Sequence, residues 1–262
     1  MDIPIIGFGT YRLGKSTNDS VRHAINIGYR HIDTAPLYKN EAIVGNAINK
    51  SGINRQNLFI TTKISRKELE TNSIAESIEN SLKNMGMDYL DLVLLHEPID
   101  YIKNWGLLVE YYNTIGKNKV RFIGVSNFNE KQLKNIYNVN NINVNPYCNQ
   151  IELSPFLLRN PIVEYCNRNN IKIVAHSPLT KGEKLEDTRL KTLANEYNIS
   201  PSQLMLKWNL QQNNIVIPRS KNNSHIEENL QIIDIIDTRI TDEDMELMKS
   251  FDCRYTTHPK YL

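Results

Sequence analysis

The sequence predicts an α/β fold, a (β/α)8 TIM barrel with a short C-terminal tail, as a single domain over residues 1–262. Short apolar runs recur along the chain, and segments with helical periodicity separate them. The length of 262 residues also suits a fold that usually needs about 250. A doubly wound sheet is the alternative. However, Gly7-Phe8-Gly9 leads into Thr10 without the third glycine of the dinucleotide-binding fingerprint.

Eight apolar runs are the candidate strands. Each is short, nearly continuous in apolar residues and bounded by turn residues, which is the pattern of parallel strands buried on both faces. The runs cover residues 5–10, 31–35, 59–64, 89–96, 122–127, 148–153, 171–176 and 215–218.

The intervening segments carry the periodicity of amphipathic helices. Ile78 and Leu82 illustrate the spacing, and Ser200 before Pro201 suits the start of a further helix. Helices are expected over residues 41–50, 73–85, 130–137, 161–169, 189–197 and 201–211, and a further one starts near Tyr101. Acidic residues 242–244 suit the first turn of a last helix.

Composition excludes several classes of protein. The formal net charge is +2 and 40% of residues are hydrophobic, which is typical of a globular protein and not of a disordered chain. A nucleic-acid partner is not expected, because the small basic excess is dispersed along the chain. No apolar run approaches the roughly 20 residues of a membrane span, and the first residues lack the pattern of a signal peptide, so we expect a cytoplasmic protein without a membrane partner.

The cysteines and short motifs do not indicate a metal site or a nucleophile. Cys148, Cys166 and Cys253 are widely spaced, so neither a metal knuckle nor a redox pair is predicted. No HxH cluster offers metal ligands and no GxSxG elbow is present, which disfavours a metal enzyme or a barrel hydrolase.

Polar side chains stand at the carboxyl ends of seven predicted strands. In such a barrel these ends meet at one mouth, where catalytic groups lie. The residues at these ends are Asp33 with Tyr38 five residues on, Lys63, His96, Ser126 with Asn127, Gln150, His176, and Arg219 with Ser220.

The first four of these residues suggest a proton donor. A phenol has an ordinary pKa of about 10, and a nearby ammonium lowers that value, so Lys63 is expected to lower the pKa of Tyr38. Asp33 would hold Lys63 charged and in place. His96 would hydrogen-bond a substrate carbonyl oxygen, and the matching reaction is hydride delivery to the carbonyl carbon.

Taken singly, each of these residues also has an ordinary structural interpretation. Asp33 suits a helix cap, Lys63 a surface ion pair and His96 a structural histidine. Asn127 can be a turn residue and Gln150 a clamp on backbone. Their common place at strand ends is what favours a functional site.

Several segments resemble the aldo-keto reductase family, in the right order and almost end to end. Residues 28–41, containing His31-Ile32-Asp33-Thr34-Ala35, resemble its first signature, and residues 87–96 its fourth-strand segment. Residues 123–128 and 149–152 resemble the next two strand ends. Ile217-Pro218-Arg219-Ser220, followed by residues 226–229, resembles the segment at the cofactor phosphate.

The resemblance implies a (β/α)8 reductase that binds a nicotinamide cofactor without a Rossmann domain. It implies that Tyr38 is the proton donor, tuned by Asp33 and Lys63, and that His96 orients a small carbonyl substrate. It implies NADPH, with NADH possible, because an Arg fork suits a phosphate. The cofactor-binding positions it implies are Ser126, Asn127, Gln150, His176, Ser177, Leu179, Arg219, Ser220, Lys221, His225, Glu228 and Asn229.

Four positions depart from the family pattern. His176 stands where a Tyr usually stacks under the nicotinamide, and His225 where an Arg is usual near the 2′-phosphate, which softens the preference for NADPH. Ser65 and Glu97 replace two Trp residues of the usual pocket wall. With Tyr11 they are expected to line a pocket that is more open and more polar than usual.

The connections are short after the fourth and seventh strands, as is the tail after Phe251. Short loops suggest a shallow site for small carbonyl substrates, with Tyr255, His258 and Tyr261 as further candidates to line it. Similarity suggests a monomer. The alternative function is a cofactor-binding regulatory or accessory protein with vestigial catalysis, since some relatives of the fold are regulatory subunits.

Overall fold

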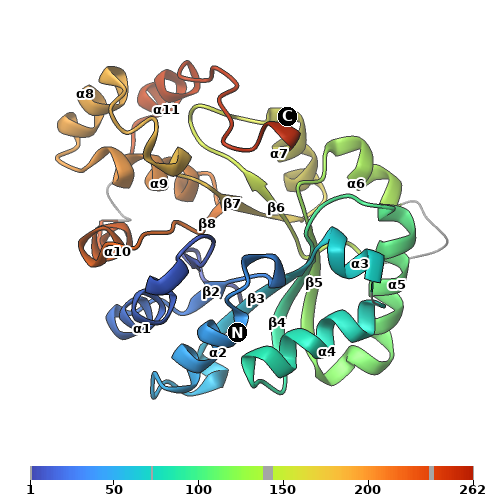
Figure 1. Ribbon diagram of the computed structural model, residues 1–262. Coiled ribbons are helices and arrows are strands. Elements are labelled where there is room, and N and C mark those ends of the chain that lie inside the picture. Colours follow the sequence, from blue (N-terminus) through green and yellow to red (C-terminus); the bar gives the residue numbers. More distant parts are fainter. Residues whose placement is uncertain (1, 72, 138–143, 236–238, 262) are drawn as a thin grey trace.

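The computed structural model describes residues 2–71, 73–137, 144–235 and 239–261. Within them, eight parallel strands form one sheet in the order of the chain, and helices cover its outside (Figure 1). The strands are β1 (Phe8–Gly9), β2 (His31–Asp33), β3 (Phe59–Ile64), β4 (Leu90–Leu95), β5 (Val120–Ser126), β6 (Cys148–Glu152), β7 (Lys172–His176) and β8 (Ile215–Val216).

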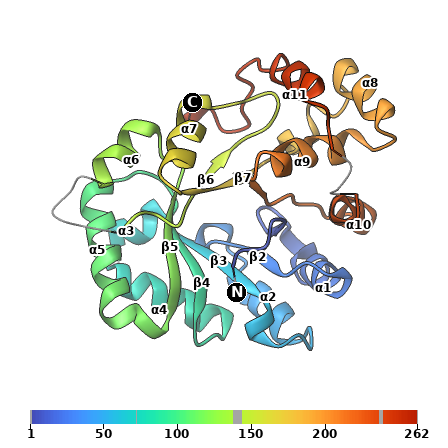
Figure 2. The ribbon, with the colours of Figure 1, turned by 180° about the vertical axis from the view of Figure 1, so that it is seen from behind.

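The helices alternate with the strands, as the periodicity predicts. The view from behind shows the same ring of helices around the strands (Figure 2). They are α1 (Thr17–Ile27), α2 (Glu41–Asn49), α3 (Arg66–Thr71), α4 (Ile74–Met85), α5 (Tyr101–Asn113), α6 (Glu130–Tyr137), α7 (Asn160–Arg168), α8 (Thr188–Glu196), α9 (Pro201–Gln211), α10 (Asn223–Leu230) and α11 (Asp242–Lys249).

The two ends of the sheet are joined by backbone hydrogen bonds. Gly7 N donates to Val216 O at 2.8 Å, Gly9 N donates to Pro218 O at 3.0 Å, and Ile6 forms a parallel bridge with Val216. The sheet therefore curls until β8 returns to the segment before β1, which is the (β/α)8 arrangement expected from the sequence.

Side-chain alternation along the strands separates two apolar layers. In β4, Leu92 and Leu94 join a cluster inside the curled sheet, whereas Val93 and Leu95 join the larger core beneath the helices. Both faces of each strand are therefore buried, and this explains why the strands appear in the sequence as continuous apolar runs.

Local signals set several helix ends. Ser73 and Ser200 form capping boxes with Glu76 and Gln203, at the first turns of α4 and α9. Gly86 ends α4 with φ of 62°, a left-handed conformation that glycine adopts without steric cost.

The observed elements differ from the predicted ones in two ways. The helices α1, α3 and α10 were not predicted, although α1 buries Val21, Ala24 and Ile25 on one face. The first and last strands are shorter than predicted, and β8 stops before Pro218, which has no N–H to donate. Among the described residues, no helix is long and apolar enough to cross a membrane.

Candidate active site

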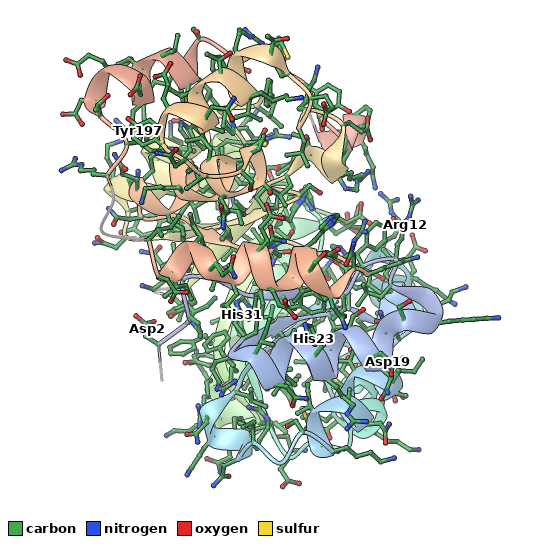
Figure 3. All side chains as sticks on the ribbon, turned by 90° about the vertical axis from the view of Figure 1, so that its left-hand side faces the viewer. Asp2, Arg12, Asp19, His23, His31 and Tyr197 are labelled. Atoms are coloured by element: carbon green, nitrogen blue, oxygen red, sulfur yellow. The ribbon has the colours of Figure 1, made fainter. Side chains whose placement is uncertain are left out.

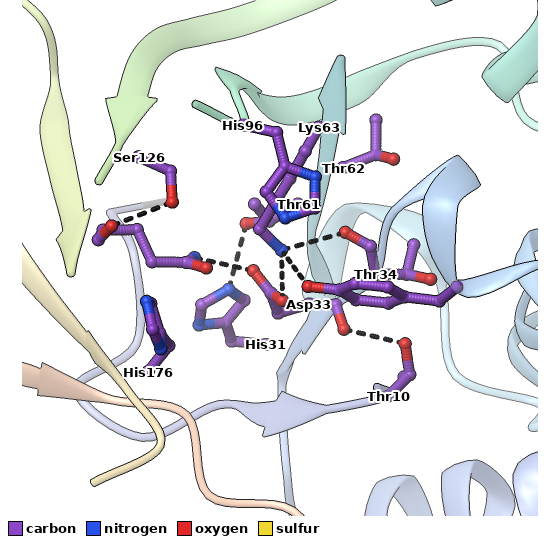
Figure 4. Close-up of polar contacts among 12 residues, drawn as sticks. Thr10, His31, Asp33, Thr34, Thr61, Thr62, Lys63, His96, Ser126 and His176 are labelled. Carbon is purple, nitrogen blue, oxygen red and sulfur yellow. Dashed lines mark hydrogen bonds and ion pairs between the residues drawn. The ribbon is translucent and has the colours of Figure 1, made fainter. Parts of the chain in front are cut away.

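A pocket of about 200 Å³ opens at the carboxyl ends of the strands. It is lined by most of the residues predicted at those ends, including Asp33, Tyr38, His96, Asn127 and Gln150. These side chains come from four different strands or the loops after them, and all of them line the same pocket. Figure 4 shows two of them, Asp33 and His96, beside Lys63. The end of the barrel at which they meet is the one where (β/α)8 enzymes place their chemistry.

Lys63 is the centre of the polar network in this pocket. Its Nζ donates to Asp33 Oδ1 at 2.5 Å, to the backbone oxygen of Thr34 at 3.1 Å and to Tyr38 Oη at 3.2 Å (Figure 4). Lys63 is 1% exposed and Asp33 is 2% exposed, so water does not screen the pair. The ammonium has three acceptors, and one of them is a phenol at the pocket wall.

The second oxygen of Asp33 is also bound. Gln150 Nε2 donates to Asp33 Oδ2 at 2.8 Å, so the carboxylate is held from both sides. Gln150 was predicted to bind cofactor; in this structure its amide nitrogen belongs to the Asp33 network. Its amide oxygen makes no hydrogen bond within the described residues.

The pKa of Tyr38 differs from the prediction in its direction. Burial raises the pKa of Tyr38 above its ordinary value of 10, and the neighbouring charge of Lys63 offsets this only in part. Burial has the largest single effect on Lys63 and lowers its pKa, but the charges of Asp33 and Tyr38 and the hydrogen bonds to them together outweigh burial, so the net pKa of Lys63 is raised. Tyr38 is therefore protonated and Lys63 charged at neutral pH.

His96 is a neutral imidazole at the edge of the same network. Burial, with the charge of Lys63, lowers its pKa to about 3. Its Nδ1 is buried without a hydrogen-bond partner among the described residues, so Nε2 is the nitrogen that reaches the pocket. The ring lies 5.9 Å from the Tyr38 ring between centroids, edge to face, so both can approach one substrate oxygen.

Asn127 links three of the predicted cofactor positions. Its φ of 63° turns the chain at the end of β5. Its Nδ2 donates to Ser126 Oγ and to His96 O, both at 3.1 Å, and its Oδ1 lies 3.0 Å from His176 Nε2. His176 is thereby held at the pocket wall, and burial keeps the pKa of His176 well below 6.5.

Three cations lie in or beside the pocket. Arg219 and Lys181 line it, together with Ser177 and Leu179, and Arg12 is close enough to Arg219 to lower its pKa after the larger effect of burial. Within the described residues, neither Arg12 nor Arg219 has an acidic partner. Asp2 pairs with Lys172, the first residue of β7, and Figure 3 shows Arg12 on the opposite side of the molecule from Asp2. Arg12 therefore lies on the side of the carboxyl ends of the strands, where the pocket opens.

The remaining predicted cofactor residues lie beyond the pocket lining, at or near α10. Ser220 Oγ accepts from Asn222 N at 3.0 Å, which shapes the turn into this helix, and Glu228 accepts from Ser202 Oγ at 2.7 Å. The others are Lys221 and His225, which are exposed, and Asn229, which is buried.

The predicted substrate residues are divided between the pocket and its rim. Tyr11 lines the pocket, 5.0 Å from the Tyr38 ring between centroids. Ser65 does not line it and donates instead to Glu68. Glu97 is outside the lining as well and pairs with Lys260 of the tail.

Other lining residues were not singled out from the sequence. Thr10 Oγ1 donates to the backbone oxygen of Asp33 at 3.0 Å, and Leu37 and Lys181 complete parts of the wall. Of the tail residues, His258 lines the pocket and Tyr255 contacts Glu183. The Tyr261 side chain lies outside the described part of the chain.

Comparison with known proteins identifies the family. The profile of the aldo/keto reductase family matches residues 5–252 of this chain. The chain belongs to the aldo/keto reductase family. The segments that resembled this family in sequence are therefore those of a true member, and the (β/α)8 arrangement is the one its solved members share.

Individual family members are similar over nearly the whole chain. A 9,11-endoperoxide prostaglandin H2 reductase of Trypanosoma cruzi is 36% identical and covers 93% of this chain and 86% of its own. A glyoxal reductase of Bacillus subtilis is also 36% identical, covering 94% of this chain and 88% of its own. The structure of an aldo-keto reductase from a deep-sea metagenome library has a TM-score of 0.89 at 32% identity and covers 98% and 94%.

Proposed function

We propose that this aldo-keto reductase uses NADPH to reduce small aldehydes and ketones to alcohols, with Tyr38 as the general acid. The observation that carries the proposal is the set of hydrogen bonds at Lys63, which joins buried Asp33 to the Tyr38 hydroxyl inside the pocket. Family membership supports carbonyl reduction and a nicotinamide cofactor.

Each residue of the network has a distinct part in proton delivery. The raised pKa of Tyr38 keeps its proton available at neutral pH. Once the proton has moved to the substrate oxygen, the hydrogen bond from Lys63 stabilises the phenolate. Asp33 keeps Lys63 charged, and neutral His96 donates from Nε2 to the same substrate oxygen.

The residues of the pocket fit a nicotinamide cofactor. The amide oxygen of Gln150 and the Ser126–Asn127 pair offer hydrogen bonds for a carboxamide, and His176 offers a ring face. Arg219 offers an unpaired charge for a phosphate. When bound, the cofactor supplies the hydride that the carbonyl carbon receives.

The size and the wall groups of the pocket favour small carbonyl compounds as substrates. Its volume of about 200 Å³ includes the space that the nicotinamide ring takes, and its walls carry hydroxyl, amide and imidazole groups. One relative is named for glyoxal and another for a prostaglandin endoperoxide, so family membership alone does not choose the substrate. The hydrogen-bonding groups in the pocket walls favour a small dicarbonyl compound such as glyoxal.

The accessory-protein alternative is not favoured. Two similar proteins carry reductase names, and Lys63 of this chain is within hydrogen-bond distance of the Tyr38 hydroxyl. The monomeric state, the cytoplasmic location and the lack of a nucleic-acid partner stay predictions.

The test is Tyr38→Phe, measured by NADPH oxidation with small aldehydes and 2-oxoaldehydes. Loss of the proton that Tyr38 donates should reduce kcat/KM about 10³-fold, within the range of general acids, while the Kd for NADPH stays within about twofold. The matched control is Tyr11→Phe, which removes a hydroxyl from the neighbouring ring and should keep kcat/KM within about threefold. Full activity of Tyr38→Phe would disprove the proposed role.

A further inference from the structure

The tail that follows α11 is anchored to a buried carboxylate. Glu152 is the last residue of β6 and is 2% exposed. It accepts three hydrogen bonds from the tail: from Thr256 Oγ1 at 2.5 Å, from Thr257 N at 2.8 Å and from Thr257 Oγ1 at 2.7 Å. Hydrogen bonds to an ionised carboxylate are stronger than neutral ones, so this anchor fixes the tail on the pocket end of the barrel.

Further contacts tie the tail to the loops at the pocket rim. Lys181 Nζ donates to the backbone oxygen of Thr257 at 2.9 Å, and Lys260 pairs with Glu97. In Figures 1 and 2 the tail accordingly returns from α11 towards α7. The tail is therefore held from the loops after β4 and β7 as well as from β6.

The anchor presents one side chain to the pocket. His258 follows Thr257 directly, lines the pocket, and packs edge to face against His176 with ring centroids 5.5 Å apart. Its ring lies 6.4 Å from that of Tyr11, which in turn is 5.0 Å from Tyr38. An arc of rings thus runs from His96 through Tyr38 and Tyr11 to His258, and only His258 comes from the tail.

The ring nitrogens of His258 are available to hydrogen-bond a substrate. It makes no hydrogen bond of its own within the described residues, whereas His176 is bound to Asn127. Burial, and then the charge of Lys181, lowers the pKa of His258, so the ring is neutral and offers both an N–H and a lone pair. Among the residues that the structure describes, His258 is not part of a cluster that could hold a metal ion.

We propose that His258 determines specificity by binding an oxygen on the carbon next to the reacting carbonyl, and that Glu152 is the positioning residue that holds His258 there. The inference rests on the proposed function, because Tyr38 and His96 must take the reacting oxygen. A second oxygen of the substrate, on the neighbouring carbon, then faces the arc of rings and accepts or donates a hydrogen bond at His258. Small carbonyl compounds with such a neighbouring oxygen, 2-oxoaldehydes among them, are the class this wall selects.

The first experiment compares methylglyoxal with propanal, which has the same number of carbons but lacks the second oxygen. In His258→Phe, which keeps an aromatic ring without nitrogen atoms, kcat/KM for methylglyoxal should fall about tenfold. For propanal it should stay within about twofold, as should the Kd for NADPH. An equal loss with both aldehydes, or a changed Kd for NADPH, would overturn the role of His258 in specificity.

The second experiment tests the anchor without touching His258. Thr256→Val with Thr257→Val removes both hydroxyls, and the matched control, Thr256→Ser with Thr257→Ser, keeps them. The valine variant should raise KM for methylglyoxal about fivefold at nearly constant kcat and speed hydrogen exchange at the Thr257 amide. The serine variant should match the wild type in both measurements.

The outcomes distinguish failure of this inference from failure of the proposed reductase function. A wild-type enzyme that reduces neither aldehyde would refute the proposed function. An active enzyme whose preference for methylglyoxal survives release of the tail, seen as faster exchange at Thr257, would refute the anchor alone.

Discussion

Two buried carboxylates with cationic partners lie at opposite ends of β2 and β4, the two strands that flank β3. Asp33 ends β2 and pairs with Lys63, Nζ to Oδ1 at 2.5 Å. Asp91 stands near the start of β4 and pairs with Arg55 at 2.7 Å and Arg121 at 2.9 Å. Both carboxylates are buried. By residue type and burial alone, either cluster could be taken for a catalytic site.

The partners of each cluster show the difference. Asp91 also accepts from Ile60 N at 2.9 Å, and Arg55 and Arg121 both lie over the Tyr89 ring. The groups around Asp91 thus bind one another. Lys63, in contrast, donates one of its hydrogen bonds to Tyr38, which lines the pocket. A buried ion pair indicates chemistry when one of its members also contacts a group that a substrate can reach.

The largest effect is expected from removing Lys63. In Lys63→Met, kcat/KM for carbonyl reduction should fall about 10³-fold, because no charge then stabilises the phenolate of Tyr38. The matched change, Arg55→Met, removes a cation from Asp91 and should leave kcat/KM within about threefold. Both are measured by NADPH oxidation on folded protein. Similar losses in the two variants would mean that the comparison between the clusters is wrong.

Asp91→Asn should lower the stability of the protein and leave its activity unchanged. Loss of the carboxylate charge leaves Arg55 and Arg121 facing each other around a neutral amide, and the free energy of unfolding should fall by about 3 kcal/mol. Urea unfolding measures that loss, and kcat/KM of the folded fraction should be unchanged. A variant as stable as the wild type would show that the ion cluster is not what stabilises this end of the barrel.

A third test uses the histidine at the start of β2. His31 is fully buried, and burial lowers its pKa to about 4. The unfolded chain binds a proton near pH 6.5 and the folded chain does not, so the unfolding free energy falls as the pH drops from about 6.5 towards 4. Between pH 7 and pH 5 His31 should account for about 2 kcal/mol of that fall.

His31→Gln measures this contribution. The variant should lose less unfolding free energy than the wild type between pH 7 and pH 5, by about 2 kcal/mol. The exposed His225, changed to Gln, is the matched control and should leave the pH dependence as it is in the wild type. If both variants follow the wild-type curve, protonation of His31 does not limit acid stability.

The sequence was sufficient to predict the strands and which side chains meet around Lys63. Each of the eight runs overlaps an observed strand, and Lys63 donates hydrogen bonds to both Asp33 and Tyr38. This succeeded because parallel strands place their carboxyl ends at one mouth, so strand position alone determines which side chains meet.

Features that depend on tertiary packing were not predictable in the same way. The pKa of Tyr38 is raised because burial outweighs Lys63, and a sequence does not display burial. Ser65 and Glu97 were placed in the pocket by analogy, yet Ser65 turns to Glu68 and Glu97 to Lys260. The role of Glu152 needs the tail to meet β6 across about a hundred residues of chain.

The smallest expected effect concerns two arginines, Arg121 beside Asp91 and Arg219 at the pocket. Arg121 is paired with Asp91, whereas Arg219 lies beside Arg12 with no acidic partner among the described residues. An anion between Arg12 and Arg219 would relieve their repulsion, and we expect a cofactor phosphate to do so.

Arg219→Met should therefore raise the Kd for NADPH about tenfold, measured by fluorescence titration, and should raise the Kd for NADH much less. Arg121→Met should change neither Kd. Equal weakening of NADPH and NADH by Arg219→Met would place Arg219 at a phosphate that both cofactors carry, and the preference for NADPH would then need another source.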